Sequence, residues 1–278
     1  MVGGANSRKE IACIAPFIFL ANVRIKSLIE VLTSRFFRIF AFPKPILVMS
    51  EQNTFIPLLL SLQEPSYGDF THKLIPTLSR ECILGVRIPI LRKLAKKLAK
   101  EQPQEVAQFL KALPHYYYEE NLLQGFLIEQ EKDFQQLIQL TEAFLPYIDN
   151  WAMCDTFAPK LFLKYPKETY AYILKWLKST HSYTIRYGIG LLLSNYLDDL
   201  FEQPMISLVG SIRSEEYYVN MMIAWYLATA LAKQYEATLA LIAQRSLPAF
   251  IQNKTIQKAR ESKRIPQEVK ESLLAYKI

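Results

Sequence analysis

The chain has 278 residues, of which 51% are hydrophobic and 21% charged, a balance that excludes wholesale disorder and allows one large domain or two small ones. Its formal net charge is +7, and its 8 glycines are too few for a sheet-rich fold with many hairpins. No G-x-x-x-x-G-K-[ST] and no G-x-G-x-x-G is present, so neither kind of nucleotide-binding loop is indicated.

The cysteines and histidines show no metal-ligand spacing. The chain has three of each and no C-x-x-C pair, which indicates a reducing compartment with free thiols. We expect no metal site and no cofactor. Cys154 lies beside Asp155, where a nucleophilic thiol is one interpretation, but a small buried hydrophobe is the favoured one.

The first 48 residues differ in composition from the rest of the chain. They contribute +5 of the net charge, and their apolar run, residues 11–23, is shorter than the roughly 20 residues of a membrane span. A basic flank before a short apolar run resembles a secretory signal, but no small-x-small cleavage site follows. We favour a start at Met49, with residues 1–48 as upstream sequence. The alternatives are a signal-like or membrane-associating segment and an amphipathic helix of the fold.

From Met49 onward nearly every segment has helical periodicity, with prolines mainly at segment boundaries. Helix pairs that recur every 30 to 40 residues are typical of a HEAT-like repeat solenoid, an α-α superhelix with a curved, concave surface. We therefore predict an all-α fold for a single domain, residues 49–278, with a loop at Tyr67-Gly68-Asp69. The predicted helices are 54–62, 90–100, 104–113, 118–130, 134–147, 150–163, 167–178, 182–197, 203–211, 215–232, 235–243, 249–260 and 266–277.

The predicted helix 90–100 is amphipathic, with Lys93 and Lys97 on a basic face. Such a face is either solvated or in contact with phosphates. A second basic cluster, Lys254, Lys258 and Arg260, lies near the end of the chain and has the same two interpretations.

Trp151 and Asp155 are four residues apart at the start of a predicted helix, with Asp149 or Asn150 as its N-cap. They therefore share one helix face. A buried carboxylate needs a partner, so Trp151 and Asp155 are not suited to pack together in a core. On a concave surface they fit a binding site for a flat cation. The alternative is a core tryptophan beside a solvated aspartate.

Two further residues follow at about the repeat spacing. Arg186 lies 35 residues after Trp151, and Trp225 lies 39 residues after Arg186, so all could line one surface of a solenoid. Arg186 sits in an apolar segment, where it needs either an external anion or a partner within the protein, such as Asp155. Trp225 is either a site residue or core packing.

These segments, in this order, resemble the AlkD-like DNA alkylation repair family of HEAT-repeat DNA glycosylases over roughly residues 50–278. The segments that carry the resemblance are Leu84-Gly85-Val86-Arg87-Ile88-Pro89, Asp149-Asn150-Trp151 with Asp155, Ser182-Tyr183-Thr184-Ile185-Arg186-Tyr187-Gly188, Tyr217-Tyr218-Val219 with Ala224-Trp225, and Asn253-Lys254 with Lys258-Ala259-Arg260-Glu261-Ser262.

The resemblance implies that Asp155, Trp151 and Trp225 are catalytic residues, with the two indoles cradling the damaged nucleoside and Asp155 facing the sugar. Arg186 would hold a backbone phosphate, and the concave surface would face DNA. The residues expected to bind DNA are Arg186, Lys93, Lys97, Lys254, Lys258 and Arg260. Residues 49–278 carry a net charge of only +2, which is modest for a duplex binder.

The leading hypothesis is a monofunctional glycosylase that hydrolyses the N-glycosidic bond of N3- or N7-alkylated purines in duplex DNA, without flipping the base into a pocket. One alternative is a catalytically silent HEAT-repeat protein that binds unusual or branched DNA. Another is a protein-binding α-solenoid scaffold. We expect a cytoplasmic monomer whose partner is alkylated double-stranded DNA, with no membrane association of the main domain.

Overall fold

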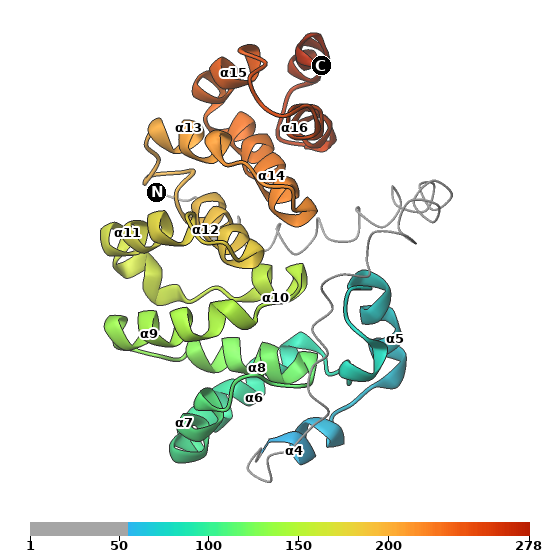
Figure 1. Ribbon diagram of the computed structural model, residues 1–278, viewed down its shortest axis with the longest axis vertical. Coiled ribbons are helices and arrows are strands. Elements are labelled where there is room, and N and C mark those ends of the chain that lie inside the picture. Colours follow the sequence, from blue (N-terminus) through green and yellow to red (C-terminus); the bar gives the residue numbers. More distant parts are fainter. Residues whose placement is uncertain (1–54) are drawn as a thin grey trace. The chain divides into compact units, whose positions relative to one another are not determined.

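The structure is a computed structural model that describes residues 55–278, so the predictions for residues 1–48 lie outside the described residues. All regular elements of the described part are helices, which confirms the predicted all-α fold (Figure 1). The α-helices are α4 (Ile56–Ser61), α5 (Pro65–Leu74), α6 (Ile88–Glu101), α7 (Pro103–Lys111), α8 (Tyr118–Ile128), α9 (Phe134–Phe144), α10 (Trp151–Thr156), α11 (Pro166–Trp176), α12 (Ser182–Asn195), α13 (Pro204–Ser211), α14 (Tyr217–Lys233), α15 (Tyr235–Ala243), α16 (Ala249–Glu261) and α17 (Gln267–Ser272). Short 3-10 helices are η2 (Arg80–Cys82), η3 (Leu145–Tyr147), η4 (Lys160–Lys164) and η5 (Leu273–Tyr276).

From α6 to α16 the helices form two layers. The even-numbered helices α6, α8, α10, α12, α14 and α16 pack each against the next (Figure 1). The odd-numbered helices lie beside them, with α7 on α6 and α8, α9 on α8, α11 on α12, and α13 and α15 on α14. This stacking of successive helix pairs is that of an α-helical repeat solenoid.

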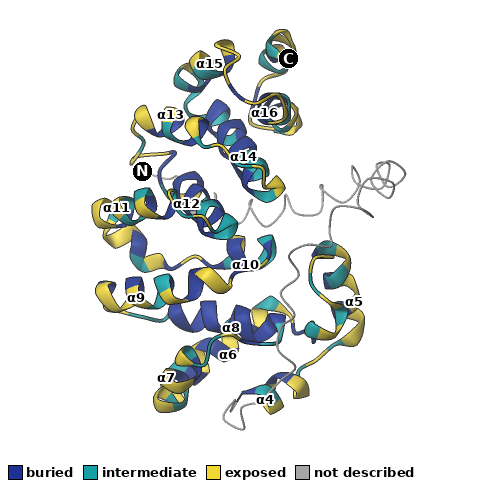
Figure 2. Ribbon diagram, viewed as in Figure 1, coloured by how far each residue is buried: buried dark blue, intermediate teal, exposed yellow. Residues whose placement is uncertain are grey.

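The even-numbered layer contains the most deeply buried helices. All eleven residues of α8 are buried, and α14 is largely buried as well (Figure 2). A helix covered on several sides needs apolar residues all round, which explains why α14 lacks the one-sided pattern of α6. Side chains that stay partly exposed on this layer are therefore candidates for a functional role. Among residues 55–278, no helix has both the length and the apolar character needed to cross a membrane.

Two local predictions are wrong. Tyr67-Gly68-Asp69 lies inside α5, not in a loop, because Pro65 starts the helix and Gly68 serves a tertiary contact. A Cβ on Gly68 would lie 2.7 Å from the guanidinium of Arg80, so the glycine admits that side chain.

The predicted helix 150–163 is also wrong, because α10 ends at Thr156 and only the 3-10 helix η4 follows. Pro159 cannot donate to a helical carbonyl and disfavours a helical residue before it. The freed backbone groups find distant partners. Arg92 Nη2 donates to the Thr156 carbonyl at 2.9 Å, and the Ala158 N–H donates to Glu129 Oε1 at 2.8 Å.

The backbone conformation at position 85 requires a glycine. Its φ is +90°, and a Cβ there would lie 2.2 Å from the Glu64 carbonyl oxygen. We expect Gly85→Ala to lower the free energy of unfolding by at least about 2 kcal/mol, through strain and steric conflict. Gly190→Ala is the matched control, since its added Cβ would meet only Met222 at 3.7 Å within α12. Urea unfolding should show that control as neutral or stabilised, and equal losses in both variants would contradict the assignment.

Candidate nucleic-acid interface

The helix that carries Trp151 and Asp155 begins where a side chain caps it. Asn150 is extended, with φ −150° and ψ 156°, and its side-chain oxygen accepts from the Met153 N–H at 2.9 Å. Of the two predicted N-caps, Asn150 is therefore the one used. This start places Trp151 and Asp155 on one face of α10.

Trp151 is half-buried and fixed at its polar edge. Its indole N–H donates to the Leu74 carbonyl oxygen at 3.3 Å, at the end of α5, and the ring packs against the core. The contact joins residues that are 77 positions apart. One part of the ring stays accessible while its orientation is set.

Arg186 and Asp155 form a bidentate ion pair between α12 and α10. Arg186 Nε donates to Asp155 Oδ1 at 2.9 Å, and Nη2 donates to Oδ2 at 2.6 Å. The internal partner considered for Arg186 is thus the one it has. Burial alone would lower the pKa of Arg186, but the Asp155 carboxylate outweighs this and raises it, so the guanidinium stays charged.

The pair is asymmetric in its exposure. Arg186 is 5% exposed, whereas the side chain of Asp155 is 20% exposed. Each carboxylate oxygen has accepted one N–H from Arg186 and keeps a further lone pair. Asp155 can therefore accept a hydrogen bond from a water or a sugar hydroxyl while Arg186 holds its orientation.

Arg186 also ties α14 to the pair, because its Nη1 donates to the Tyr218 carbonyl oxygen at 2.6 Å. Tyr218 begins a partly exposed line on α14 that reaches Trp225 about two turns later. Trp225 is half-buried and packs against the core on one side. The Tyr183 ring, on α12, lies 6.1 Å from that of Tyr218, centroid to centroid.

Cys154 is a packing residue. It is buried, its Sγ lies 3.5 Å from the Tyr183 carbonyl oxygen, and burial raises the pKa of the thiol well above its ordinary value. A protonated, enclosed thiol is a poor nucleophile. The described geometry therefore gives no support to the nucleophile hypothesis.

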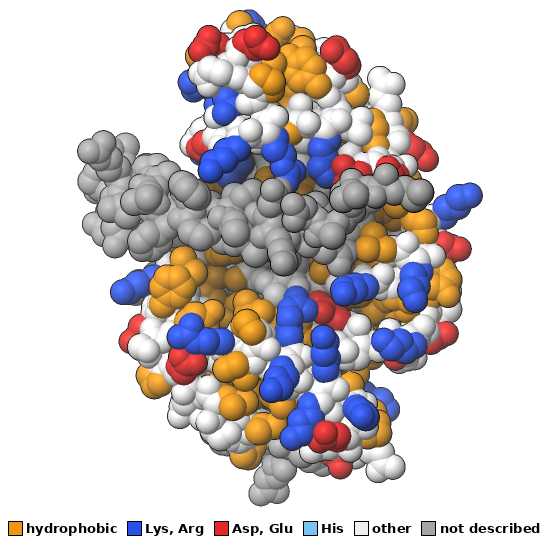
Figure 3. Space-filling model, turned by 180° about the vertical axis from the view of Figure 1, so that it is seen from behind, with side chains coloured by type: hydrophobic (Ala, Val, Ile, Leu, Met, Phe, Trp, Pro, Cys, Tyr) orange, Lys and Arg blue, Asp and Glu red, His pale blue; other side chains and the backbone are white. Residues whose placement is uncertain are grey.

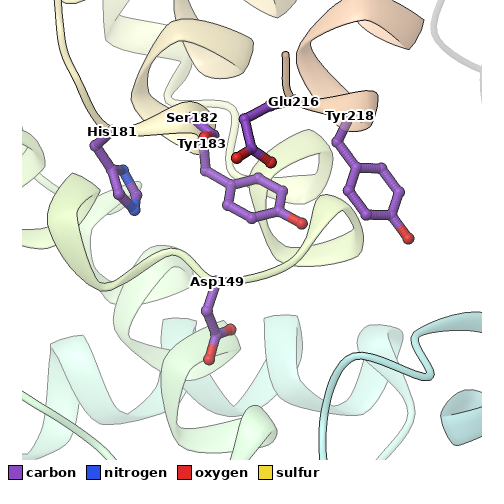
Figure 4. A pocket seen from close by; sticks show the side chains of 6 residues that line it. All are labelled: Asp149, His181, Ser182, Tyr183, Glu216 and Tyr218. Atoms are coloured by element: carbon purple, nitrogen blue, oxygen red, sulfur yellow. The ribbon is translucent and has the colours of Figure 1, made fainter. Parts of the chain in front are cut away.

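A pocket of about 260 Å³ opens beside the ion pair, where the N-terminal ends of α10, α12 and α14 meet. Figure 4 shows the Tyr183 and Tyr218 rings next to each other, with the Glu216 carboxylate above and the Asp149 carboxylate below. Carboxylates and tyrosines favour a cationic or hydrogen-donating group over a phosphate. The lining residues are Asp149, His181, Ser182, Tyr183, Glu216 and Tyr218.

Positive charge adjoins this region from α16. Lys254 and Lys258 are one turn apart and partly exposed, and Arg260 is exposed. Burial lowers the pKa of Lys258, and the nearby charges of Lys254 and Arg186 lower it further, although Glu261 opposes them. The positive charge of Arg186 therefore acts on the Lys258 ammonium. Within residues 55–278 no carboxylate oxygen lies within 4.0 Å of the Lys258 ammonium.

This environment predicts a pH-dependent contact. A bound phosphate would raise the pKa of Lys258, so a complex would keep the proton to a higher pH than the free protein. DNA affinity should then fall as pH rises above the lowered pKa of Lys258 in the free protein. Lys258→Gln should remove that dependence and reduce the salt slope of binding by about 1. Fluorescence anisotropy across pH and salt measures both, and an unchanged profile in Lys258→Gln would refute the contact.

The other predicted DNA-binding residues lie apart from the ion pair. Lys93 and Lys97 are exposed on α6, and Lys97 Nζ is 3.8 Å from Glu101 Oε2 in the same helix. Figure 3 shows Lys and Arg side chains over both the lower and the upper helices of one face. Among the described residues, no three His, Cys, Asp or Glu side chains gather in a way that could hold a metal ion.

The family model described as DNA alkylation repair enzyme matches residues 66–261, more than half of the chain. The chain belongs to the DNA alkylation repair enzyme family. A search of curated proteins gave no match.

Membership in the DNA alkylation repair enzyme family gives the chain a role in DNA repair. The matched region runs from α5 to α16 and includes Trp151, Asp155, Arg186 and Trp225. The geometry joins Asp155 and Arg186 directly, and connects them to α14 through the Tyr218 carbonyl. Among the described residues, neither Lys93 nor Lys97 forms a hydrogen bond or ion pair with Asp155 or Tyr218.

Some residues of this region were not singled out from the sequence. Tyr183 and Tyr218 are in the family-like segments, but nothing local distinguishes them from core tyrosines. Asp149 and Glu216 lie at or just before helix N-caps, where acidic residues are common for reasons of capping alone. Their convergence on one pocket depends on helix packing.

Proposed function

We propose that this DNA alkylation repair enzyme is a monofunctional DNA glycosylase that hydrolyses the N-glycosidic bond of N3- or N7-alkylated purines in duplex DNA. The observation that supports this best is the Asp155 carboxylate, held by buried Arg186 and still partly open to solvent. Trp151 is on the same face of α10, and Trp225 follows Tyr218 along α14.

The chemistry needs few groups. An alkylated purine is cationic and leaves with the electrons of the glycosidic bond, while water adds to the anomeric carbon and gives up a proton. The sugar passes through an oxocarbenium-like state that a fixed carboxylate stabilises. Asp155 has lone pairs for that role and for orienting the water. Because Arg186 fixes the carboxylate in advance, little reorganisation is needed.

The indoles supply binding for a cation. A tryptophan face attracts a positive charge by about 0.5–2 kcal/mol. Trp151 and Trp225 are both half-buried, so each has a fixed edge and an accessible part. In this proposal they contact the damaged nucleoside, which is approached in the duplex without a closed base pocket.

In this proposal, cations on two separate helices contact backbone phosphates. Lys254, Lys258 and Arg260 supply charge from α16, and Lys93 and Lys97 supply it from α6. Arg186 uses three of its five N–H groups on Asp155 and Tyr218. The proposal leaves its two remaining N–H groups for a phosphate.

The test is release of free base. The full chain is incubated with duplex DNA that contains 7-methylguanine, and the released base and abasic sites are both counted by chromatography and strand scission. We expect equal amounts of each. Tight duplex binding without release would reject the glycosylase.

That outcome would favour the second candidate, a catalytically silent DNA-binding solenoid. The observation on its side is the same ion pair, because a carboxylate already neutralised by a guanidinium can serve to hold α10 and α12 together. Binding with a steep salt dependence but no abasic product would support it.

A further inference from the structure

Two aromatic rings lie exposed where α14 and α16 begin. Tyr217 is 54% exposed and Phe250 is 41% exposed, yet their ring centroids are only 5.9 Å apart. Tyr217 also packs edge-on against Tyr218, at 5.3 Å and 78°. Single exposed hydrophobic residues are ordinary, but here two exposed rings adjoin, with their planes tilted by 58°, and form one aromatic surface. Tyr218 ties that surface to Arg186 through its carbonyl.

The charges around this surface are unequal. Lys254 Nζ lies 5.8 Å from the Phe250 ring centroid, and Lys258 follows one turn later on α16. On the other side, Glu215 and Glu216 are exposed directly before Tyr217. An anionic group can therefore approach along α16 and is repelled from the start of α14. The rings themselves offer stacking and no hydrogen-bond code.

We propose that Tyr217 and Phe250 form a stacking platform for one unpaired nucleobase, whose phosphates lie toward Lys254 and Lys258. The proposal rests on the DNA binding proposed above and defines a preferred substrate, a duplex with an unpaired nucleotide near the lesion. Bases inside an intact duplex are covered on both faces, so only an unpaired base can offer a face to the rings. Base–aromatic stacking accepts any base and is usually combined with a cationic track for the backbone, which is the arrangement on α16.

The test compares two duplexes of one sequence, one fully paired and one with a single unpaired 2-aminopurine, a base whose fluorescence falls on stacking. The full chain should bind the second duplex about tenfold more tightly, with quenched fluorescence. Tyr217→Leu and Phe250→Leu keep an apolar side chain but lose the π face. Each variant should lower the ratio of the two affinities by about fivefold and should reduce the quenching. Its affinity for the paired duplex should change by less than about twofold.

Tyr165→Leu is the matched control. Tyr165 is 39% exposed and stacks on Phe134 at 4.7 Å, but it lies at the start of α11 in the other layer. It should behave as wild type with both duplexes. Lys254→Gln should weaken both duplexes by similar factors, since phosphate contacts do not distinguish them.

The outcomes separate the two proposals. Equal affinity for both duplexes, or a preference that survives both leucine variants, overturns the platform and leaves the DNA binding intact. No binding to either duplex overturns the DNA binding, and the platform with it. Loss of preference in Tyr165→Leu as well would assign the effect to general destabilisation and reject the platform.

Discussion

Asp155→Asn is expected to lower the rate of 7-methylguanine release by about 100-fold or more, the size of effect seen when one pre-oriented transition-state contact is removed. The carboxylate charge acts on the oxocarbenium-like sugar, so its loss should appear in the single-turnover rate and leave duplex affinity within a few-fold. Single-turnover kinetics with excess protein measures the rate, and anisotropy measures the affinity.

The substitution also touches stability, because Arg186 is left buried beside a neutral amide. Asn keeps one acceptor oxygen and Asp155 is partly exposed, so we expect a loss of about 2 kcal/mol in the free energy of unfolding. Rates are therefore compared well below the melting temperature. Asp198→Asn is a suitable control, since Asp198 lies in the turn after α12 and pairs with Lys233 at the end of α14 at 2.6 Å. Undiminished release by folded Asp155→Asn would remove the carboxylate from the mechanism.

Arg186→Met separates orientation from charge. It removes the guanidinium but leaves a carboxylate with access to solvent. If Asp155 acts on the sugar, this variant should keep more release than Asp155→Asn, with a weaker apparent affinity. Undiminished release by folded Arg186→Met would contradict the orienting role of the guanidinium.

Much of the fold could be predicted because its signals are local. Pro103 and Pro204 occupy the first turns of α7 and α13, where a missing N–H costs nothing, and the sequence periodicity fixed the helices between. One of the two errors has a distant cause. From the sequence, Gly68 resembles a turn residue. A glycine is needed there because the Arg80 guanidinium, from η2, packs against it. The break before Pro159 has a local cause that the helical periodicity masked, and only the partner of the freed Thr156 carbonyl, Arg92, is 64 residues away.

The candidate site was predictable only to the extent that side-chain chemistry demands a partner. An arginine in an apolar helix requires an anion, which made Asp155 a candidate partner for Arg186 at repeat spacing. Contacts to backbone carbonyls carry no such signal. Neither the Leu74 carbonyl under Trp151 nor the Tyr218 carbonyl on Arg186 depends on residue type. The exposure of Tyr217 likewise follows from packing alone.

Glu119→Gln is expected to lower the free energy of unfolding by about 2–4 kcal/mol, although the two side chains have the same shape. Glu119, on α8, is 1% exposed. Its carboxylate accepts from the N–H groups of Leu84 at 2.8 Å, Gly85 at 2.7 Å and Val86 at 3.3 Å. Burial raises the pKa of Glu119, and these three donors oppose that rise.

An amide cannot replace this carboxylate. Glutamine offers one acceptor oxygen, and its NH₂ would face a backbone N–H, so at least one buried donor loses its partner. The affected backbone, Leu84-Gly85-Val86, leads directly into α6. The sequence of residues 84–86 is thus explained by its structure. Gly85 has a positive φ, and its N–H and those of its two neighbours converge on one buried carboxylate.

The matched control is Glu131→Gln. Glu131 Oε1 also accepts from two backbone N–H groups, those of Lys132 at 2.6 Å and Asp133 at 2.9 Å, but at the protein surface. Water can replace those bonds, so urea unfolding should show a loss below about 1 kcal/mol. If Glu119→Gln cost no more than this control, the carboxylate would not be what orders residues 84–86. The entry into α6, with Lys93 and Lys97, would then depend on apolar packing alone.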